Sequence, residues 1–117
     1  MPDIDLILFA LADPARRRGV ELLRAGPQRP GALADALALS RPAMSRHLRV
    51  LRSAALVEID ELDGDARGRL VRICPAPFAA LRAWVAETEA LWNDQLSAFV
   101  AYAEAQGERS GGGEGPR

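Results

Sequence analysis

Several residue types are scarce in this chain of 117 residues, and each scarcity excludes a class of protein. The single cysteine, Cys74, excludes an internal disulfide. One cysteine and one histidine, His47, are too few for the three or four nitrogen and sulfur ligands of a zinc site within one subunit. No apolar run has the length of a membrane span, and the first residues lack the basic start and cleavage site of a secretory signal. We therefore expect a cytoplasmic protein without a metal or another cofactor.

Lysine is absent altogether, so all 15 residues counted as lysine plus arginine are arginines. Codon bias in a GC-rich genome is the simplest explanation, although the planar guanidinium group also suits guanine edges and phosphates. The net charge of −1 hides an uneven distribution. Residues 14–57 contain nine arginines and only two acids, Glu21 and Asp35, which is a net charge of +7, whereas the rest of the chain is acidic. Contact with nucleic-acid phosphates requires a local basic patch of this kind.

Residues 40–56 have the pattern of a short helix with one apolar and one basic face. Met44, Leu48 and Leu51 recur at helical spacing and form an apolar stripe. Ser40 is suited to cap the start of this helix, because its hydroxyl can accept a hydrogen bond from a free N–H of the first turn. The residues away from the stripe are polar or basic: Ser45, Arg46, Arg49 and Arg52.

The rest of the chain predicts a mainly α, winged helix-turn-helix fold. We expect helices over residues 4–12, 14–25, 30–37 and 40–56, and one long helix from residue 78 to about residue 105. Two strands over residues 56–62 and 69–74, joined by a turn that contains Asp-Gly, predict a β-hairpin, the wing. Residues 1–105 are assigned to one domain for DNA binding and dimerisation. Residues 106–117 are rich in glycine and are expected to be a disordered tail.

Two predicted helices have more apolar surface than a domain of this size can bury. The first helix is apolar nearly all round. The last one, with roughly 27 residues, would be about 40 Å long. We therefore expect a homodimer whose interface contains Ile4, Leu8, Leu91, Trp92, Leu96 and Phe99. Trp84 and Trp92 are interpreted as packing residues rather than as part of a ligand site.

Three stretches resemble the ArsR/SmtB family of winged-helix transcriptional repressors. Residues 11–18 (LADPARRR) are similar to a helix start of that family, and residues 40–57 (SRPAMSRHLRVLRSAALV) are similar to its recognition helix. Residues 78–84 (FAALRAW), with Trp92, resemble the last helix of the SdpR-like subgroup, which lacks metal sites. The resemblance covers roughly residues 3–105. It implies a homodimer whose first and last helices pair across a two-fold axis, with the fourth helix of each subunit in a major groove.

The chain also departs from the family pattern. Ala55 stands where the family usually has glycine, and a left-handed backbone there would cost alanine roughly 1 kcal/mol. The family's Cys-x-Cys pattern near the third helix and its Asp/His set on the last helix are both absent, so we expect no response to metals. The wing, usually basic in the family, is acidic here, which argues against strong contact with phosphates. Its acids are Glu58, Asp60, Glu61, Asp63 and Asp65.

The basic helix supplies the predicted DNA contacts. Ser45 and Arg46 are expected at base edges. Arg41, Arg49 and Arg52 are expected at phosphates, which position the protein without reading sequence. His47 either donates to a phosphate or packs beside the turn. Residues 16–18 are expected to be a solvated basic face with a minor phosphate role. The full predicted DNA-binding set is Ser40, Arg41, Ser45, Arg46, His47, Arg49, Arg52, Arg67 and Arg69.

These features favour a sequence-specific transcriptional regulator over an enzyme. No Ser/His/Asp or Cys/His spacing stands out, and Cys74, at the end of a strand, is interpreted as an inert thiol rather than a redox sensor. We expect a dimeric repressor of an inverted-repeat operator, acting on its own promoter in the simplest case. Two alternatives stay open. One is a homodimeric protein-interaction module that has lost DNA binding, and the other is a regulator that responds to a small molecule bound near Trp84.

Overall fold

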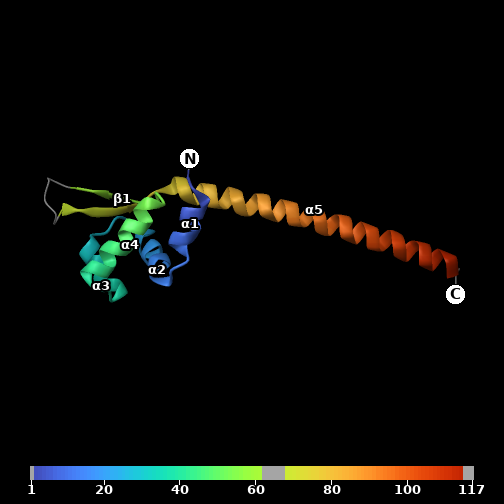
Figure 1. Ribbon diagram of the computed structural model, residues 1–117, viewed down its shortest axis with the longest axis horizontal. Coiled ribbons are helices and arrows are strands. Elements are labelled where there is room, and N and C mark those ends of the chain that lie inside the picture. The colour runs from blue at the N-terminus through green and yellow to red at the C-terminus, as the bar shows by residue number, and fades with distance from the viewer. Residues whose placement is uncertain (1, 62–67, 115–117) are drawn as a thin grey trace. The chain divides into compact units, whose positions relative to one another are not determined.

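The described part of the chain folds into four short helices, a two-stranded hairpin and one long helix. The computed structural model describes residues 2–61 and 68–114, with side chains to residue 108. It divides into two compact units, Met1–Leu81 and Arg82–Arg117, and the second unit is a continuation of the last helix. The predicted mainly helical, winged helix-turn-helix fold is confirmed (Figure 1). The elements are α1 (Ile4–Leu11), α2 (Pro14–Leu23), α3 (Pro30–Leu37), α4 (Arg41–Ser53), β1 (Val57–Asp60), β2 (Leu70–Ile73) and α5 (Pro75–Glu114).

Side-chain caps determine where three of the helices begin. Asp3 and Asp13 each accept hydrogen bonds from two free N–H groups, in the first turns of α1 and α2. The Ser40 hydroxyl accepts from the N–H of Ala43 at 3.2 Å, so the predicted cap of α4 is confirmed. These oxygens satisfy N–H groups that have no partner within their own helix.

Two alanines with a left-handed backbone end α3 and α4. Ala38 has φ 55° and Ala55 has φ 58°. At Ala55 this conformation returns the next N–H, that of Leu56, to the carbonyl of Leu51 at 3.0 Å. The bond closes the helix end in the Schellman arrangement, which glycine usually provides. The position where the family pattern has glycine therefore does adopt a left-handed backbone.

The core of the first unit lies where α1 to α4 meet the hairpin. The predicted apolar stripe of α4 is confirmed, because Met44, Leu48 and Leu51 are all buried. The start of α5 contributes Phe78 and Leu81, which pack against the core. The other buried apolar residues are Ile7, Ala10, Val20, Leu23, Leu33, Ala34, Leu37, Ala54, Leu56, Val57 and Val71.

The wing is an antiparallel hairpin in which Val57 pairs with Ile73 and Asp60 pairs with Leu70. Both strands are shorter than predicted. The predicted turn lies mostly within residues 62–67, outside the described residues, as does Arg67. β2 also pairs with the segment before α3. The N–H of Gln28 donates to the carbonyl of Val71 at 3.0 Å, and the N–H of Val71 donates back at 2.8 Å. This pairing ties the start of α3 to β2.

α5 is longer than predicted at both ends. It begins at Pro75 rather than at residue 78, because first-turn N–H groups have no helical partner and proline is tolerated there. It continues to Glu114, past the predicted end near residue 105. The segment from residue 106 to Glu114, which was predicted to be disordered, is helical. No proline interrupts the sequence between Pro77 and Pro116. The glycines in this stretch weaken a helix by about 1 kcal/mol each but do not block it.

Candidate nucleic-acid interface

On the side of α4 away from the core, four positions expose polar or basic side chains. Ser45, Arg46, Arg49 and Arg52 are all exposed, as predicted, and Arg41 is exposed at the first position of the helix. No acidic residue occurs within α4. Guanidinium groups on such a face are able to donate paired hydrogen bonds to guanine edges or to phosphate oxygens. Ser40 is also exposed, but its hydroxyl caps the helix.

A groove of about 530 Å³ runs between the start of α3, α4 and the segment just before β2. Three arginines line it: Arg41 at the start of α4, Arg29 just before α3 and Arg69 just before β2. Asp35 is the one acid among its lining residues. A second groove, of about 540 Å³, shares Ser45 and Arg69 with the first. It is lined further along α4 by Arg49 and Arg52, with no acid among its lining residues.

Arg29 is a residue that the sequence analysis did not assign to the site. It is the residue before α3, next to Gln28, whose pairing with Val71 holds this segment against β2. That pairing brings Arg29 to the same groove as Arg69, 40 positions later in the chain. The available signal in the sequence was its place just before a helix within the basic segment. The pairing with β2 has no signature in the sequence pattern.

Residues 16–18 were expected to form a solvated basic face, but Arg16 is partly buried and bound to other parts of the chain. Its Nε donates to the carbonyl of Ala10 at 2.7 Å, and its Nη2 donates to the carbonyl of Phe9 at 3.2 Å. Its Nη1 lies 3.1 Å from Nδ1 of His47, and its guanidinium carbon lies 5.4 Å from the centre of the Phe9 ring. Arg17 also binds the end of α1, through the carbonyls of Leu11 and Ala12, but is exposed.

His47 is half-buried in this junction rather than on the open face of α4. His47 also acts electrostatically on the carboxylate of Asp13, the cap of α2. Burial acts to raise the pKa of Asp13, but the N–H groups of Arg16 and Ala15 and the charges of Arg16 and His47 outweigh it, so the pKa is lowered.

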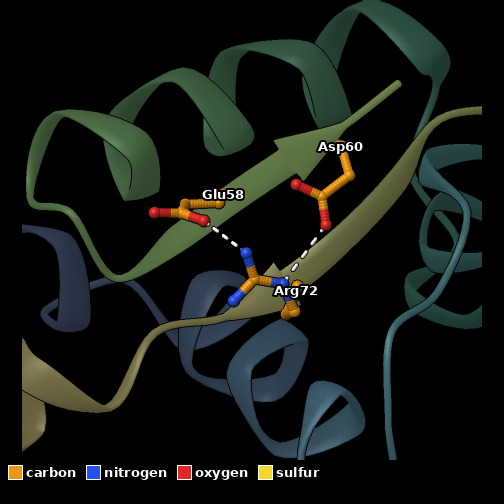
Figure 2. A network of polar contacts seen from close by, with 3 residues as sticks. All are labelled: Glu58, Asp60 and Arg72. Atoms are coloured by element: carbon orange, nitrogen blue, oxygen red, sulfur yellow. Dashed lines mark hydrogen bonds and ion pairs between the residues drawn. The ribbon is translucent and has the colours of Figure 1, made fainter. Parts of the chain in front are cut away.

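The wing neutralises one of its own arginines. Figure 2 shows Arg72 between Glu58 and Asp60 on one face of the hairpin. Its Nε donates to Asp60 at 3.2 Å, and its Nη2 donates to Glu58. The hydrogen bond to Asp60 and the charges of both acids raise the pKa of Arg72. This trio carries a net charge of −1, so this face does not offer a free cation to DNA.

Arg69 is the described wing arginine that faces α4. It makes a long ion pair with Glu61, at 3.6 Å, in which both side chains are about half exposed (48% and 60%). An exposed pair of this kind contributes little energy and is screened by salt, so Glu61 does not prevent Arg69 from binding another anion.

The predicted dimer residues are distributed over α1 and α5. Ile4 is half-buried and Leu8 is 41% exposed. Leu6 and Phe9, which were not predicted, are also exposed on α1. In the second unit, an exposed series of large apolar side chains follows α5: Trp84, Val85, Leu91, Trp92, Leu96, Phe99, Val100 and Tyr102.

Cys74 is partly buried at the end of the wing. Burial, together with the charge of Glu58, raises the pKa of its thiol, which disfavours the reactive thiolate. Among the described residues no group of three or more His, Cys, Asp or Glu side chains is placed to hold a metal ion. None of the helices in the described part of the chain has a stretch that is both long and apolar enough to cross a lipid bilayer.

The sequence is similar to a helix-turn-helix domain family and to known transcriptional regulators. Residues 11–60 match the model of a helix-turn-helix domain family. The chain is 38% identical over 99 residues to the HTH-type transcriptional regulator Rv2034 of Mycobacterium tuberculosis, covering 85% of this chain and 87% of that protein. It is 35% identical over 51 residues to the transcriptional repressor SdpR of Bacillus subtilis, covering 44% of this chain and 57% of that repressor.

The solved structures that resemble this chain include a transcriptional regulator and a winged helix-turn-helix domain. An ArsR family transcriptional regulator is 31% identical and superposes with a TM-score of 0.69, over 76% of this chain and 94% of that one. The homodimeric winged helix-turn-helix DNA-binding domain of Mb0332 from Mycobacterium bovis is 25% identical, with a TM-score of 0.59, over 81% of this chain and 82% of that one.

The fold and the basic helix define a winged helix-turn-helix protein of the DNA-binding class. The chain belongs to the ArsR family of transcriptional regulators. The similarity to SdpR agrees with the resemblance to the SdpR-like repressors.

Proposed function

We propose that the protein is a homodimeric repressor that binds an inverted-repeat operator and acts on its own promoter in the simplest case. The observation that carries this proposal is the exposed basic face of α4, continued by Arg29 and Arg69 in the adjoining grooves. A surface to which α4 and the segments before α3 and β2 contribute arginines suits the regular phosphates beside a major groove.

The predicted DNA-binding residues divide into two proposed roles. Ser45 and Arg46, in the first half of α4, are proposed to contact base edges, because the N-terminal residues of a recognition helix enter the groove most deeply. The other members bind phosphates, which position the protein without reading sequence. These are Ser40, Arg41, Arg49, Arg52 and Arg69, together with Arg29. The half-buried His47 and Arg67, which lies outside the described residues, are proposed for the same role.

The homodimer is proposed from the exposed apolar surfaces of α1 and α5. Leu91, Trp92 and Phe99 are each more than 60% exposed in the single chain. Burying one such aromatic side chain removes about 150–250 Å² from water, which is worth several kcal/mol at about 25 cal/mol per Å². The proposed interface consists of Ile4, Leu8, Leu91, Trp92, Leu96 and Phe99. The dimeric domain of Mb0332 supports the same assembly.

We infer that repression does not respond to metals. A thiolate and imidazole site needs several such ligands in one place, and this chain has one cysteine and one histidine. His47 lies on α4 and Cys74 lies beyond β2, in different elements. Zinc, nickel, cadmium and arsenite at low micromolar concentrations should therefore leave operator affinity unchanged. Stoichiometric zinc binding that releases DNA would contradict this inference and would indicate a site shared between subunits.

A gel-shift experiment with the protein's own promoter region tests the main proposal. We expect binding that weakens steeply as salt increases, and sedimentation equilibrium should give a dimer at micromolar concentration. Retained dimerisation without any DNA binding would favour the protein-interaction module instead. A regulator that responds to an organic ligand is the remaining alternative. Native mass spectrometry of the purified protein tests it, although none of the grooves described above is lined by Trp84.

A further inference from the structure

Arg16 lies at a junction of three helices, where it binds both the end of α1 and the recognition helix α4. Two of its nitrogens donate to the carbonyls of Ala10 and Phe9, at 2.7 and 3.2 Å. The third nitrogen, Nη1, lies 3.1 Å from Nδ1 of His47. A guanidinium group has donors only and no acceptor. The contact therefore requires Nδ1 of His47 to be the acceptor.

This assignment determines where the imidazole carries its proton. A neutral histidine whose Nδ1 accepts a hydrogen bond has its proton on Nε2, which points away from that partner across the ring. Within the described residues, Nε2 of His47 has no hydrogen-bond partner in the chain. Among those residues no buried side-chain nitrogen or oxygen lacks a partner. Nε2 of His47 therefore reaches the protein surface.

We infer that Arg16 is a positioning residue that holds His47 as its Nε2–H tautomer and so presents that N–H to a DNA phosphate beside α4. The phosphate contact rests on the proposed function, whereas the hold of Arg16 on the imidazole does not. Phosphate is the fitting acceptor because the ring is half-buried against α2 and cannot extend as far as the neighbouring arginines. Arg16 and its anchor at the end of α1 thereby set the geometry of a contact that Arg16 itself does not make.

The first experiment is nitrogen NMR of the full chain at pH 8.5, where an ordinary histidine is neutral. His47 is the only histidine, so every imidazole signal comes from it. We expect an unprotonated Nδ1 and a protonated Nε2 in the wild type. In Arg16→Met the two nitrogen resonances should move toward each other, as the tautomers mix. Arg17→Met is the matched control, because Arg17 also binds carbonyls at the end of α1 but does not contact His47.

Either of two NMR results would overturn the inference: a wild-type proton on Nδ1, or an unchanged imidazole spectrum in Arg16→Met. If Arg16→Met does not fold, Arg16→Lys replaces it, since lysine keeps the charge but lacks the planar fork that bridges the carbonyls and the ring. The wild-type spectrum tests the tautomer without any variant.

The second experiment measures binding to the promoter DNA. His47→Phe should lose about tenfold in affinity or more, as expected for a hydrogen bond to a charged group. The salt dependence should not change, because a neutral donor releases no counterion. His47→Gln should retain binding to within about threefold, because the amide is able both to accept from Arg16 and to donate to phosphate.

A double-mutant cycle separates positioning from a general loss of structure. If Arg16 acts through His47, Arg16→Met combined with His47→Phe should bind no more weakly than His47→Phe alone. Fully additive losses, or wild-type affinity in His47→Phe, would contradict the inference. A wild-type protein that shows the expected tautomer but binds no DNA would instead refute the proposed function, together with the phosphate contact, while leaving the hold of Arg16 on His47 intact.

Discussion

Replacing Ala55 by glycine should stabilise the folded protein. Ala55 ends α4 with φ 58°, and its N–H and that of Leu56 return to carbonyls of the last turn, at 2.9 and 3.0 Å. The conformation is therefore held by hydrogen bonds that a glycine would keep. The side chain of Ala55 is exposed, so its methyl group contributes little packing.

Two opposing terms give the expected magnitude. A left-handed backbone costs a residue with a Cβ about 1–2 kcal/mol. Glycine also makes the unfolded chain more flexible, which favours the unfolded state and offsets about 0.4–1 kcal/mol of that gain. The free energy of unfolding of Ala55→Gly should thus rise by about 0.5–1 kcal/mol, which corresponds to an increase in Tm of a few degrees for a chain of this length.

Denaturant titration at one fixed protein concentration, followed by circular dichroism, measures this change. Ala38→Gly, at φ 55°, should give a gain of the same sign. Ala79→Gly is the opposite control, because Ala79 is exposed within α5 and glycine should destabilise a regular helix by about 1 kcal/mol. Equal destabilisation by all three substitutions would show that the left-handed backbone at Ala55 stores no strain.

The pKa of Asp13 is lowered in the folded protein, so its ionised form adds stability above about pH 4, and that stability is lost as the pH falls through the lowered pKa. The difference in unfolding free energy between wild type and Asp13→Asn should therefore shrink between pH 5 and pH 3. A constant difference would contradict this. Arg29→Ala should weaken binding to all DNA sequences and reduce the salt slope by about 1, whereas Arg24→Ala, outside both grooves, should not. Removing residues 107–117 should leave the unfolding free energy unchanged to within about 0.5 kcal/mol, as measured by the same titration.

The local elements of this fold could be predicted because their signals are short-range. The stripe of Met44, Leu48 and Leu51 and the cap at Ser40 predict α4 to within a few residues, and the buried residues agree. The strands also follow from alternation, although the structure has only Val57–Asp60 and Leu70–Ile73. Boundaries are less certain because proline is tolerated in a first turn, as at the start of α5.

The site was predicted less completely, because two of its features depend on contacts between distant segments. Arg16 belongs to a run of three arginines that is typical of a solvated face, yet the free carbonyls at the end of α1 draw its guanidinium inward. Arg29 reaches the groove only because Gln28 pairs with Val71. Neither contact has a periodic pattern in the sequence. The exposed arginines of α4 were predictable, because a helix with a buried stripe leaves its other face free.

The most direct test of the account is the salt dependence of DNA binding by three proteins: wild type, Arg46→Ala and Arg49→Ala. Fluorescence anisotropy would compare DNA from the protein's own promoter with a scrambled duplex of the same length. Arg46→Ala should lose about 1–3 kcal/mol on the promoter and little on the scrambled duplex, because a base contact carries the preference. Arg49→Ala should weaken both alike, with a salt slope lower by about 1. Wild-type affinity and slope in both variants, with the fold intact, would contradict the assignment of α4 as the DNA-reading helix.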